Sequence, residues 1–210
     1  MKCSAKIFYS FILALSVTAT IILLSGCNQL TSTNDKGSTE MKISKDSFGK
    51  TKSGEQVDIY TLTNNKGCTV KITNYGGIVT GLSVPDKTGK LGDIVLGHDS
   101  LDGYVKNNNS PYFGALIGRY GNRIAKGKFT LNGQTYTLAT NNNNLNHLHG
   151  GNVGFDKVVW KAKEIKQSDA VGLELTYLSK DGEEGYPGNL SVTVKYLWTN
   201  KNELKINYEA

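Results

Sequence analysis

Apolar and polar residues alternate at every second position in five segments of the chain. These segments are residues 57–62, 68–72, 172–177, 190–196 and 203–208. A period of two is typical of β-strands that bury one face and leave the other in water. No stretch of helical periodicity is long enough to connect parallel strands. The pattern therefore predicts an all-β fold, an antiparallel β-sandwich.

Turn sequences rich in Asn, Asp and Gly separate the expected strands. They occupy residues 64–67, 86–89, 131–134 and 181–182. Asn and Gly adopt the left-handed backbone conformation that tight hairpins need, so these positions favour short antiparallel connections. Two further Asn-rich stretches, residues 107–109 and 141–144, are interpreted as polar loops.

The N-terminal segment follows a different pattern. Lys2 and Lys6 precede an uncharged run over residues 7–24, and the sequence Leu-Ser-Gly-Cys ends at Cys27. Basic, then apolar, then small residues are the order of a secretory signal. The alternative, an uncleaved membrane anchor, is less favoured because 18 residues are fewer than the roughly 20 needed to span a bilayer.

The ending in Cys27 resembles the lipobox of bacterial lipoproteins. This resemblance implies a signal peptide over residues 1–26, cleavage before Cys27, and acyl chains on that residue that hold the protein to a membrane. Residues 27–40 are polar and form the expected flexible tether. The domain is expected over residues 41–210, exported to the bacterial cell envelope.

Composition narrows the possible partners and cofactors. The 210 residues include 24 Lys and Arg against 18 Asp and Glu, a formal net charge of +6. The lysines are scattered rather than interleaved with aromatic residues, so no nucleic-acid partner is expected. Beyond the signal peptide only Cys27 and Cys68 remain, which excludes a disulfide framework and a cysteine metal site.

Arginine occurs only at Arg119 and Arg123, and every other cationic side chain is Lys. The planar guanidinium presents five donors that fit adjacent oxygens, such as neighbouring sugar hydroxyls or a carboxylate. A structural arginine paired with a buried carboxylate is the alternative. The residue chemistry leaves both interpretations open.

Histidine is also concentrated, with His147 and His149 two residues apart and only His98 elsewhere. On a strand the first two would face the same side, as in a metal pair, but no third ligand is evident. We therefore expect no metal and no cofactor. Gly150 and Gly151 follow directly, which indicates a sharp bend or a close approach of the backbone.

Several blocks of the sequence resemble the aldose 1-epimerase, or galactose mutarotase, family. Their order and loop lengths match the family from about residue 43 to the last residue. The resemblance implies a large antiparallel β-sandwich that interconverts the α and β anomers of aldohexoses such as glucose and galactose, without a cofactor. The blocks are residues 74–77, 93–97, 112–127, 148–151, 154–157 with Trp160, and 181–188.

The resemblance also assigns site residues. Asn122 and Arg123 match the family's Asn-Arg pair that binds sugar hydroxyls, and His149 matches the histidine near the anomeric carbon. Arg119 receives a supporting role. The aldohexose is the expected small-molecule partner.

Mutarotation needs a base and an acid that flank one sugar. The family's histidine acid lies in a block similar to Asn-His-Ser-Tyr-Phe-Asn-Leu, downstream of the strand at residues 204–208, and its glutamate base lies near the C-terminus. Ala210 precedes both positions. We therefore expect no catalytic residue within this chain, which would be the N-terminal part of a longer epimerase and inactive alone, with an exposed edge and an incomplete core after residue 208.

Other assignments stay open at this point. Glu183 and Glu184 are interpreted as surface carboxylates of a turn rather than a substitute base, and His147 is a possible substitute acid. The alternative function is a noncatalytic carbohydrate-binding lipoprotein that uses the same three sugar-binding residues. Glycoside hydrolysis ranks last, because it needs two carboxylates about 5 to 9.5 Å apart across a glycosidic bond.

Overall fold

The computed structural model describes residues 40–106 and 112–210, which belong to one compact unit. The expected signal peptide, the lipidated Cys27 and the Asn-rich stretch at 107–109 lie outside the described residues. Among the helices that are described, none has the length and apolar character needed to cross a membrane.

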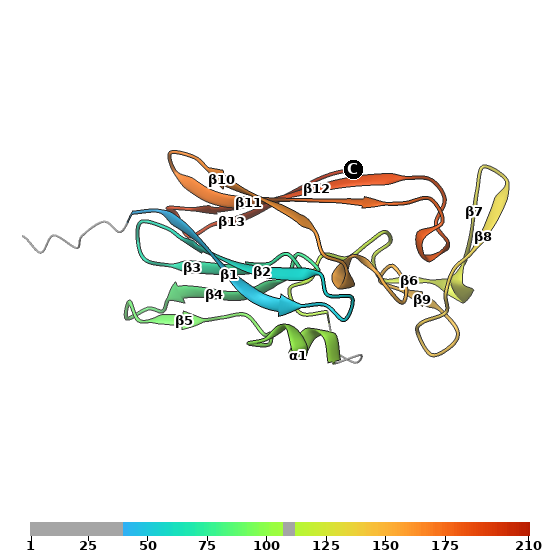
Figure 1. The fold of residues 1–210 in the computed structure, drawn as a ribbon, viewed down its shortest axis with the longest axis horizontal. Coiled ribbons are helices and arrows are strands. Elements are labelled where there is room, and N and C mark those ends of the chain that lie inside the picture. Colours follow the sequence, from blue (N-terminus) through green and yellow to red (C-terminus); the bar gives the residue numbers. More distant parts are fainter. Residues whose placement is uncertain (1–39, 107–111) are drawn as a thin grey trace, which may run out of the picture. The chain divides into compact units, whose positions relative to one another are not determined.

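Two antiparallel sheets form a β-sandwich (Figure 1). The first sheet has the order β1-β2-β3-β4-β5, and the second has the order β10-β11-β12-β13. All neighbours in both sheets are antiparallel, as the short turns predict. The strands are β1 (Lys42–Lys50), β2 (Gln56–Thr63), β3 (Thr69–Thr73), β4 (Val79–Pro85), β5 (Leu91–Asp93), β10 (Lys161–Lys166), β11 (Ala170–Ser179), β12 (Leu190–Thr199) and β13 (Leu204–Glu209).

All five strands predicted from alternation are confirmed, as β2, β3, β11, β12 and β13. The strands without a prediction include β1, β5 and β10, which lie at sheet edges. Both faces of these edge strands are largely exposed, so their sequences carry little alternation.

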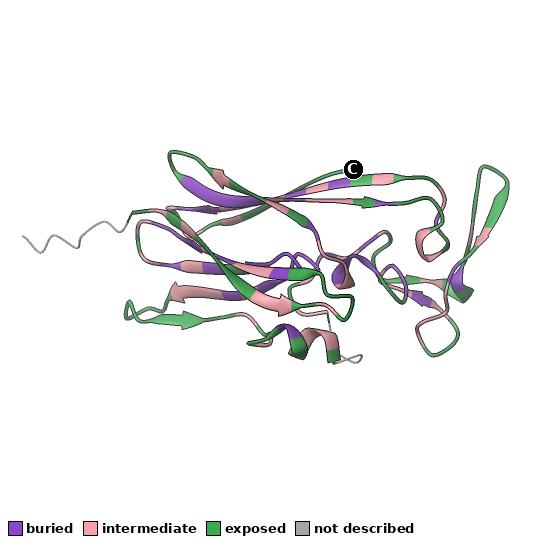
Figure 2. Ribbon diagram, viewed as in Figure 1, coloured by how far each residue is buried: buried purple, intermediate pink, exposed green. Residues whose placement is uncertain are grey.

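Fully buried side chains from both sheets fill the space between them, and the ribbon of these buried residues is purple in Figure 2. Hydrogen bonds also join the sheets, among them those from Trp198 Nε1 to the Cys68 carbonyl (3.0 Å) and from the Tyr196 hydroxyl to the Gly77 carbonyl (2.8 Å). Burial of the apolar side chains between the two sheets, away from water, stabilises the sandwich. The central residues are Leu62, Val70, Ile72, Trp160, Leu173, Leu175, Val194, Tyr196 and Trp198.

The edge strand β13 presents its apolar residues on the core side of the sheet. Ile206 and Tyr208 stand opposite Tyr196 and Val194 of β12, and directly opposed residues share a face. Ile206 is nevertheless 44% exposed and Tyr208 63% exposed. The expected exposed edge is therefore present, and its apolar face is uncovered within the described residues.

Two short ribbons and several single turns connect the strands of the two sheets. The two ribbons lie at one end of the sandwich, beside the loop that joins β11 to β12 (Figure 1). The predicted turn at 131–134 closes the β7–β8 hairpin, with Asn132 and Gly133 at positive φ. The elements are α1 (Leu101–Lys106), β6 (Arg123–Ile124) paired with β9 (His147–Leu148), β7 (Lys128–Leu131) paired with β8 (Gln134–Thr137), and three short 3-10 turns, Ala125–Gly127, Phe155–Lys157 and Glu183–Gly185.

Candidate functional site

The β6–β9 ribbon brings the three predicted sugar-binding residues together. Arg123 pairs with Leu148 in this antiparallel ladder, so Asn122 just before β6 lies opposite His149 just after β9. The His149 amide donates to the Asn122 carbonyl, and the Asn122 amide donates to His149 Nδ1, each over 3.0 Å. Residues 27 positions apart are thereby held in a fixed mutual orientation.

These hydrogen bonds determine which ring nitrogen of His149 carries the proton. Because Nδ1 accepts a hydrogen bond, the neutral ring carries its proton on Nε2. Partial burial lowers the pKa of His149 below its usual 6.5, and the Arg123 and Lys157 cations lower it further against the opposing charge of Asp156. At neutral pH the ring is therefore uncharged, and the hydrogen bonds among described residues leave its Nε2–H available as a donor.

Two asparagines orient Arg123. Its Nε donates to Asn142 Oδ1 (2.9 Å), and its Nη1 donates to Asn122 Oδ1 (3.1 Å). No carboxylate of the described residues forms an ion pair with Arg123. The alternative of an arginine paired with a buried carboxylate therefore does not describe Arg123, whose guanidinium is exposed and has donors to spare.

An aromatic ring and an ion pair flank His149 on another side. The Tyr112 ring centroid lies 4.5 Å from that of His149, and Lys157 Nζ lies 5.3 Å from the Tyr112 centroid. Lys157 also contacts the Asp156 carboxylate at 2.7 Å, while the other Asp156 oxygen is buried without a partner among the described residues. Sequence analysis gave Tyr112 and Lys157 no role, although both belong to blocks that resemble the family.

Arg119 has a different role from Arg123. Its guanidinium donates four hydrogen bonds to the β11–β12 connection, at Ser179 Oγ (2.7 Å) and at the carbonyls of Ser179 (2.9 Å), Lys180 (2.6 Å) and Pro187 (3.0 Å). These bonds tie the arginine segment to a loop about 60 residues away. Arg119 is therefore a structural arginine that uses backbone oxygens instead of a buried carboxylate.

His147 is fully buried and has partners at both ring nitrogens. Burial raises the pKa of Tyr186 to about 12, so its hydroxyl keeps its proton and donates to His147 Nε2 (2.7 Å). The Nδ1–H then donates to the Ala139 carbonyl (2.8 Å). This arrangement rules out a substitute acid at His147 and an open metal pair with His149. In the described part of the chain, no group of three potential metal ligands occurs.

Glu183 and Glu184 lie in a turn, as the sequence predicts, and both are half-buried. Glu183 accepts from the Tyr177 hydroxyl (2.8 Å) and Ser179 Oγ (2.7 Å), and Glu184 accepts from the amides of Asn152 (2.8 Å) and Val153 (2.9 Å). The local turn folds back on the structure, so each carboxylate accepts two hydrogen bonds from neighbouring protein groups. The partners of Glu184 lie more than 30 residues away in the sequence, and sequence spacing gave no signal for them.

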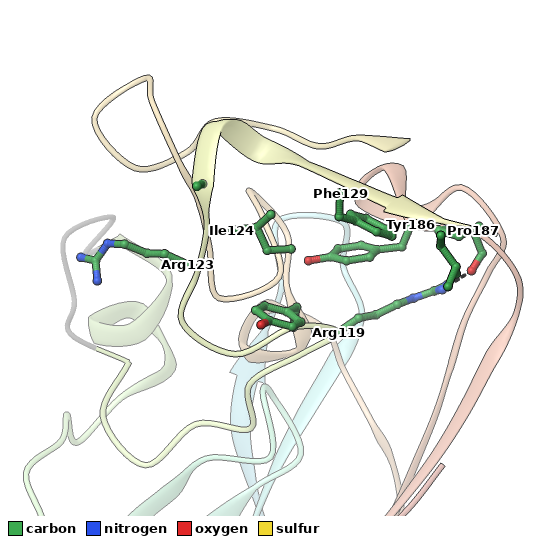
Figure 3. Close-up of a pocket in the computed structure, with 9 residues that line it drawn as sticks. Arg119, Arg123, Ile124, Phe129, Tyr186 and Pro187 are labelled. Atoms are coloured by element: carbon green, nitrogen blue, oxygen red, sulfur yellow. Dashed lines mark hydrogen bonds between the residues drawn. The ribbon is translucent and has the colours of Figure 1, made fainter. Parts of the chain in front are cut away.

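A pocket of about 560 Å³ lies beside β6, on the hairpin side (Figure 3). Ile124, Phe129 and Tyr186 point into it, and Arg123 also lines it, with its guanidinium directed away from the other three side chains. Side chains alternate across a strand, which places Ile124 and Arg123 on opposite sides of β6. Asn122 and His149 do not line this pocket, so Arg123 is the one of the three predicted sugar-binding residues that borders it.

The fold defines the class of protein: an all-β sandwich of the galactose epimerase type. A crystal structure of galactose 1-epimerase from Lactobacillus acidophilus NCFM is similar, with a TM-score of 0.70 and 27% identity over 80% of this chain and 48% of that one. The family model described as aldose 1-epimerase matches residues 58–210. The chain therefore belongs to the aldose 1-epimerase family.

Relatives with assigned names agree with this placement. Galactose mutarotase of Bos taurus is 49% identical over 141 residues, which cover 67% of this chain and 39% of the relative. Aldose 1-epimerase of Escherichia coli K12 is 37% identical over 157 residues, covering 75% of this chain and 44% of the relative. The chain thus spans less than half the length of the relatives it matches.

Proposed function

We propose that this chain provides the sugar-binding part of an aldose 1-epimerase, which interconverts the α and β anomers of aldohexoses such as glucose and galactose. The main support is the reciprocal hydrogen bonding of Asn122 and His149, which orients a neutral imidazole beside an exposed arginine. Planar guanidinium donors suit adjacent sugar hydroxyls. The Nε2–H of His149 suits an oxygen near the anomeric carbon.

In the proposed reaction a base removes the proton of the anomeric hydroxyl, and an acid protonates the ring oxygen as the bond from C1 to that oxygen breaks. The open aldehyde rotates about C1–C2, and closure on the other face reverses the proton transfers. Arg123 and His149 would hold the sugar through both forms. This binding keeps the reacting oxygens in place while the ring is open.

The two proton transfers are proposed for a histidine and a glutamate beyond Ala210. Within the described residues Glu183 and Glu184 are each engaged by two donors, and His147 is engaged at both nitrogens. A noncatalytic carbohydrate-binding protein is therefore the second candidate for these 210 residues taken alone.

Polarimetry of freshly dissolved α-D-galactose or α-D-glucose separates the two candidates. Faster decay of optical rotation with the protein than without it supports the epimerase. Hexose binding without acceleration supports the binding protein. A chain that neither binds hexose nor accelerates the decay would contradict both candidates.

We also propose that the protein is an exported lipoprotein acylated at Cys27. The support is the order of basic, apolar and small residues before this cysteine. Incorporation of labelled palmitate in a bacterial host tests the assignment, and Cys27→Ser should abolish both the label and membrane retention. Equal labelling of the wild type and the Cys27→Ser variant would contradict it.

A further inference from the structure

The Glu184 carboxylate binds the loop that follows His149. Its two oxygens accept hydrogen bonds from two successive backbone amides, those of Asn152 (2.8 Å) and Val153 (2.9 Å). An ionised acceptor makes such bonds shorter and stronger than a neutral one. The loop between His149 and Asn152 contains only Gly150 and Gly151, so this contact lies very near the proposed sugar-binding histidine.

Close packing on both sides confines the same turn. A Cβ atom at Gly151 would lie 2.0 Å from Glu184 Oε2, and one at Gly150 would lie 1.6 Å from the Gly118 carbonyl oxygen. His149 itself has a φ of 50°, in the left-handed region that non-glycine residues occupy only when their surroundings hold them there. The turn is thus held between the Glu184 carboxylate and the Gly118 backbone.

Glu184 is in turn fixed to the arginine segment. It lies in the β11–β12 connection, whose residues Ser179, Lys180 and Pro187 accept the four hydrogen bonds of Arg119. Arg119 precedes Asn122 by three residues in the chain. A closed circuit of contacts therefore runs from Asn122 through His149, the 152–153 amides and Glu184 back to Arg119.

We infer that Glu184 is a positioning residue, which acts on the sugar through the orientation of His149. This inference rests on the proposed sugar-binding role of His149. Glu184 itself does not touch the sugar; its carboxylate fixes the 152–153 backbone, which keeps the His149 ring against the Asn122 amide. Loss of the carboxylate frees the ring to turn away from the site.

Glu184→Gln tests the inference with little change of shape. An amide has one accepting oxygen, so Asn152 or Val153 loses its acceptor, and Glu184→Ala removes both acceptors. The matched control is Glu183→Gln, which makes the same charge change one residue away without touching the 152–153 backbone. Each variant is made in the full chain and compared with the wild type by thermal unfolding.

The first readout is hydrogen exchange of the Asn122 amide, which donates to the His149 ring. Exchange should accelerate about tenfold in Glu184→Gln and further in Glu184→Ala, with little change in Glu183→Gln, because local opening exposes amides independently of global unfolding. The second readout is D-galactose affinity, which should fall about tenfold in Glu184→Gln because a small misplacement weakens an oriented contact.

The two readouts separate the inference from the function on which it rests. Unchanged Asn122 exchange in Glu184→Gln, or equal acceleration in Glu183→Gln, would overturn the positioning role. If Glu184→Ala does not fold, Glu184→Gln still decides between these results. Exchange that responds to Glu184 in a chain that binds no hexose supports the positioning role and contradicts the proposed function.

Discussion

Two Arg-His pairs at the same end of the sandwich have opposite surroundings. Arg119 donates its hydrogen bonds to residues between 179 and 187, at the end of β11 and in the β11–β12 connection. His147 bonds to Tyr186 of the same connection and to Ala139, which precedes β9. Arg123 and His149 have fewer internal partners and an open surface around them. The members of each residue type are only four and two positions apart in sequence.

In these two pairs the hydrogen-bond partners, rather than the residue type, distinguish a structural side chain from a proposed sugar-binding one. A guanidinium with four internal hydrogen bonds has little left for a ligand, whereas one oriented by two asparagines keeps donors free. The same holds for an imidazole with both nitrogens engaged and one that keeps Nε2–H available. Substitutions at matched positions therefore should affect stability in the first pair and sugar affinity in the second.

The largest effect is expected at His147. His147→Ala leaves a cavity and removes the acceptor of the Tyr186 hydroxyl, so the free energy of unfolding should fall by about 3 kcal/mol. His149→Ala, at a half-buried site, should cost less than about 1 kcal/mol. Urea unfolding of the full-chain variants measures both values. Equal losses at the two histidines would remove the distinction between the pairs.

The two arginines give the next largest contrast. Arg119→Lys loses the planar fork that binds the 179–187 connection, so unfolding should become easier by about 2 kcal/mol. Arg123→Lys should leave the melting temperature nearly unchanged and weaken D-galactose binding about tenfold, as expected for a lost bidentate contact. Calorimetric titration and thermal unfolding measure the two effects. A destabilised Arg123→Lys variant with normal affinity would show a structural role for Arg123.

The smallest effect concerns pH. The pKa of His149 is lowered by its burial and by Arg123 and Lys157, so the folded chain binds fewer protons there than the unfolded chain. The contribution of His149 to folding stability is therefore fully present above pH 6.5, the pKa of the unfolded chain. It is lost as the pH falls through the lowered pKa of the folded chain. His149→Gln should flatten the melting temperature between pH 7.5 and 5.5, roughly the range around that pKa. An identical pH profile in the variant would contradict the lowered pKa.

Alternation predicted the sandwich because its inner strands bury one face. Leu173 and Leu175 on β11 and Val194 on β12 are fully buried, so their spacing records the core directly. The edge strands β1 and β10 are mostly polar and exposed and lack this signal. Their place in the sheets follows from pairing with β2 and β11, which local sequence does not encode.

Residue types and family motifs predicted only part of the candidate site. The rare arginines and the His-Leu-His-Gly-Gly sequence indicated Arg123 and His149, and the glycine pair correctly predicted a close approach. The hydrogen-bond partners that distinguish the role of Arg119 from that of Arg123 lie some 20 to 70 residues away in sequence. Such distant contacts form only on folding, so the sequence alone left the structural and functional readings open.

The most direct test of the account is a titration of the isotopically labelled full chain with D-galactose, followed by amide and imidazole NMR. We expect saturable shifts centred on Asn122, the Arg123 guanidinium and the His149 ring, with the Arg119 guanidinium and the His147 ring unaffected. Shifts centred on Arg119 and His147, or no saturable shift at any of these groups, would contradict the claim that the open pair binds the sugar.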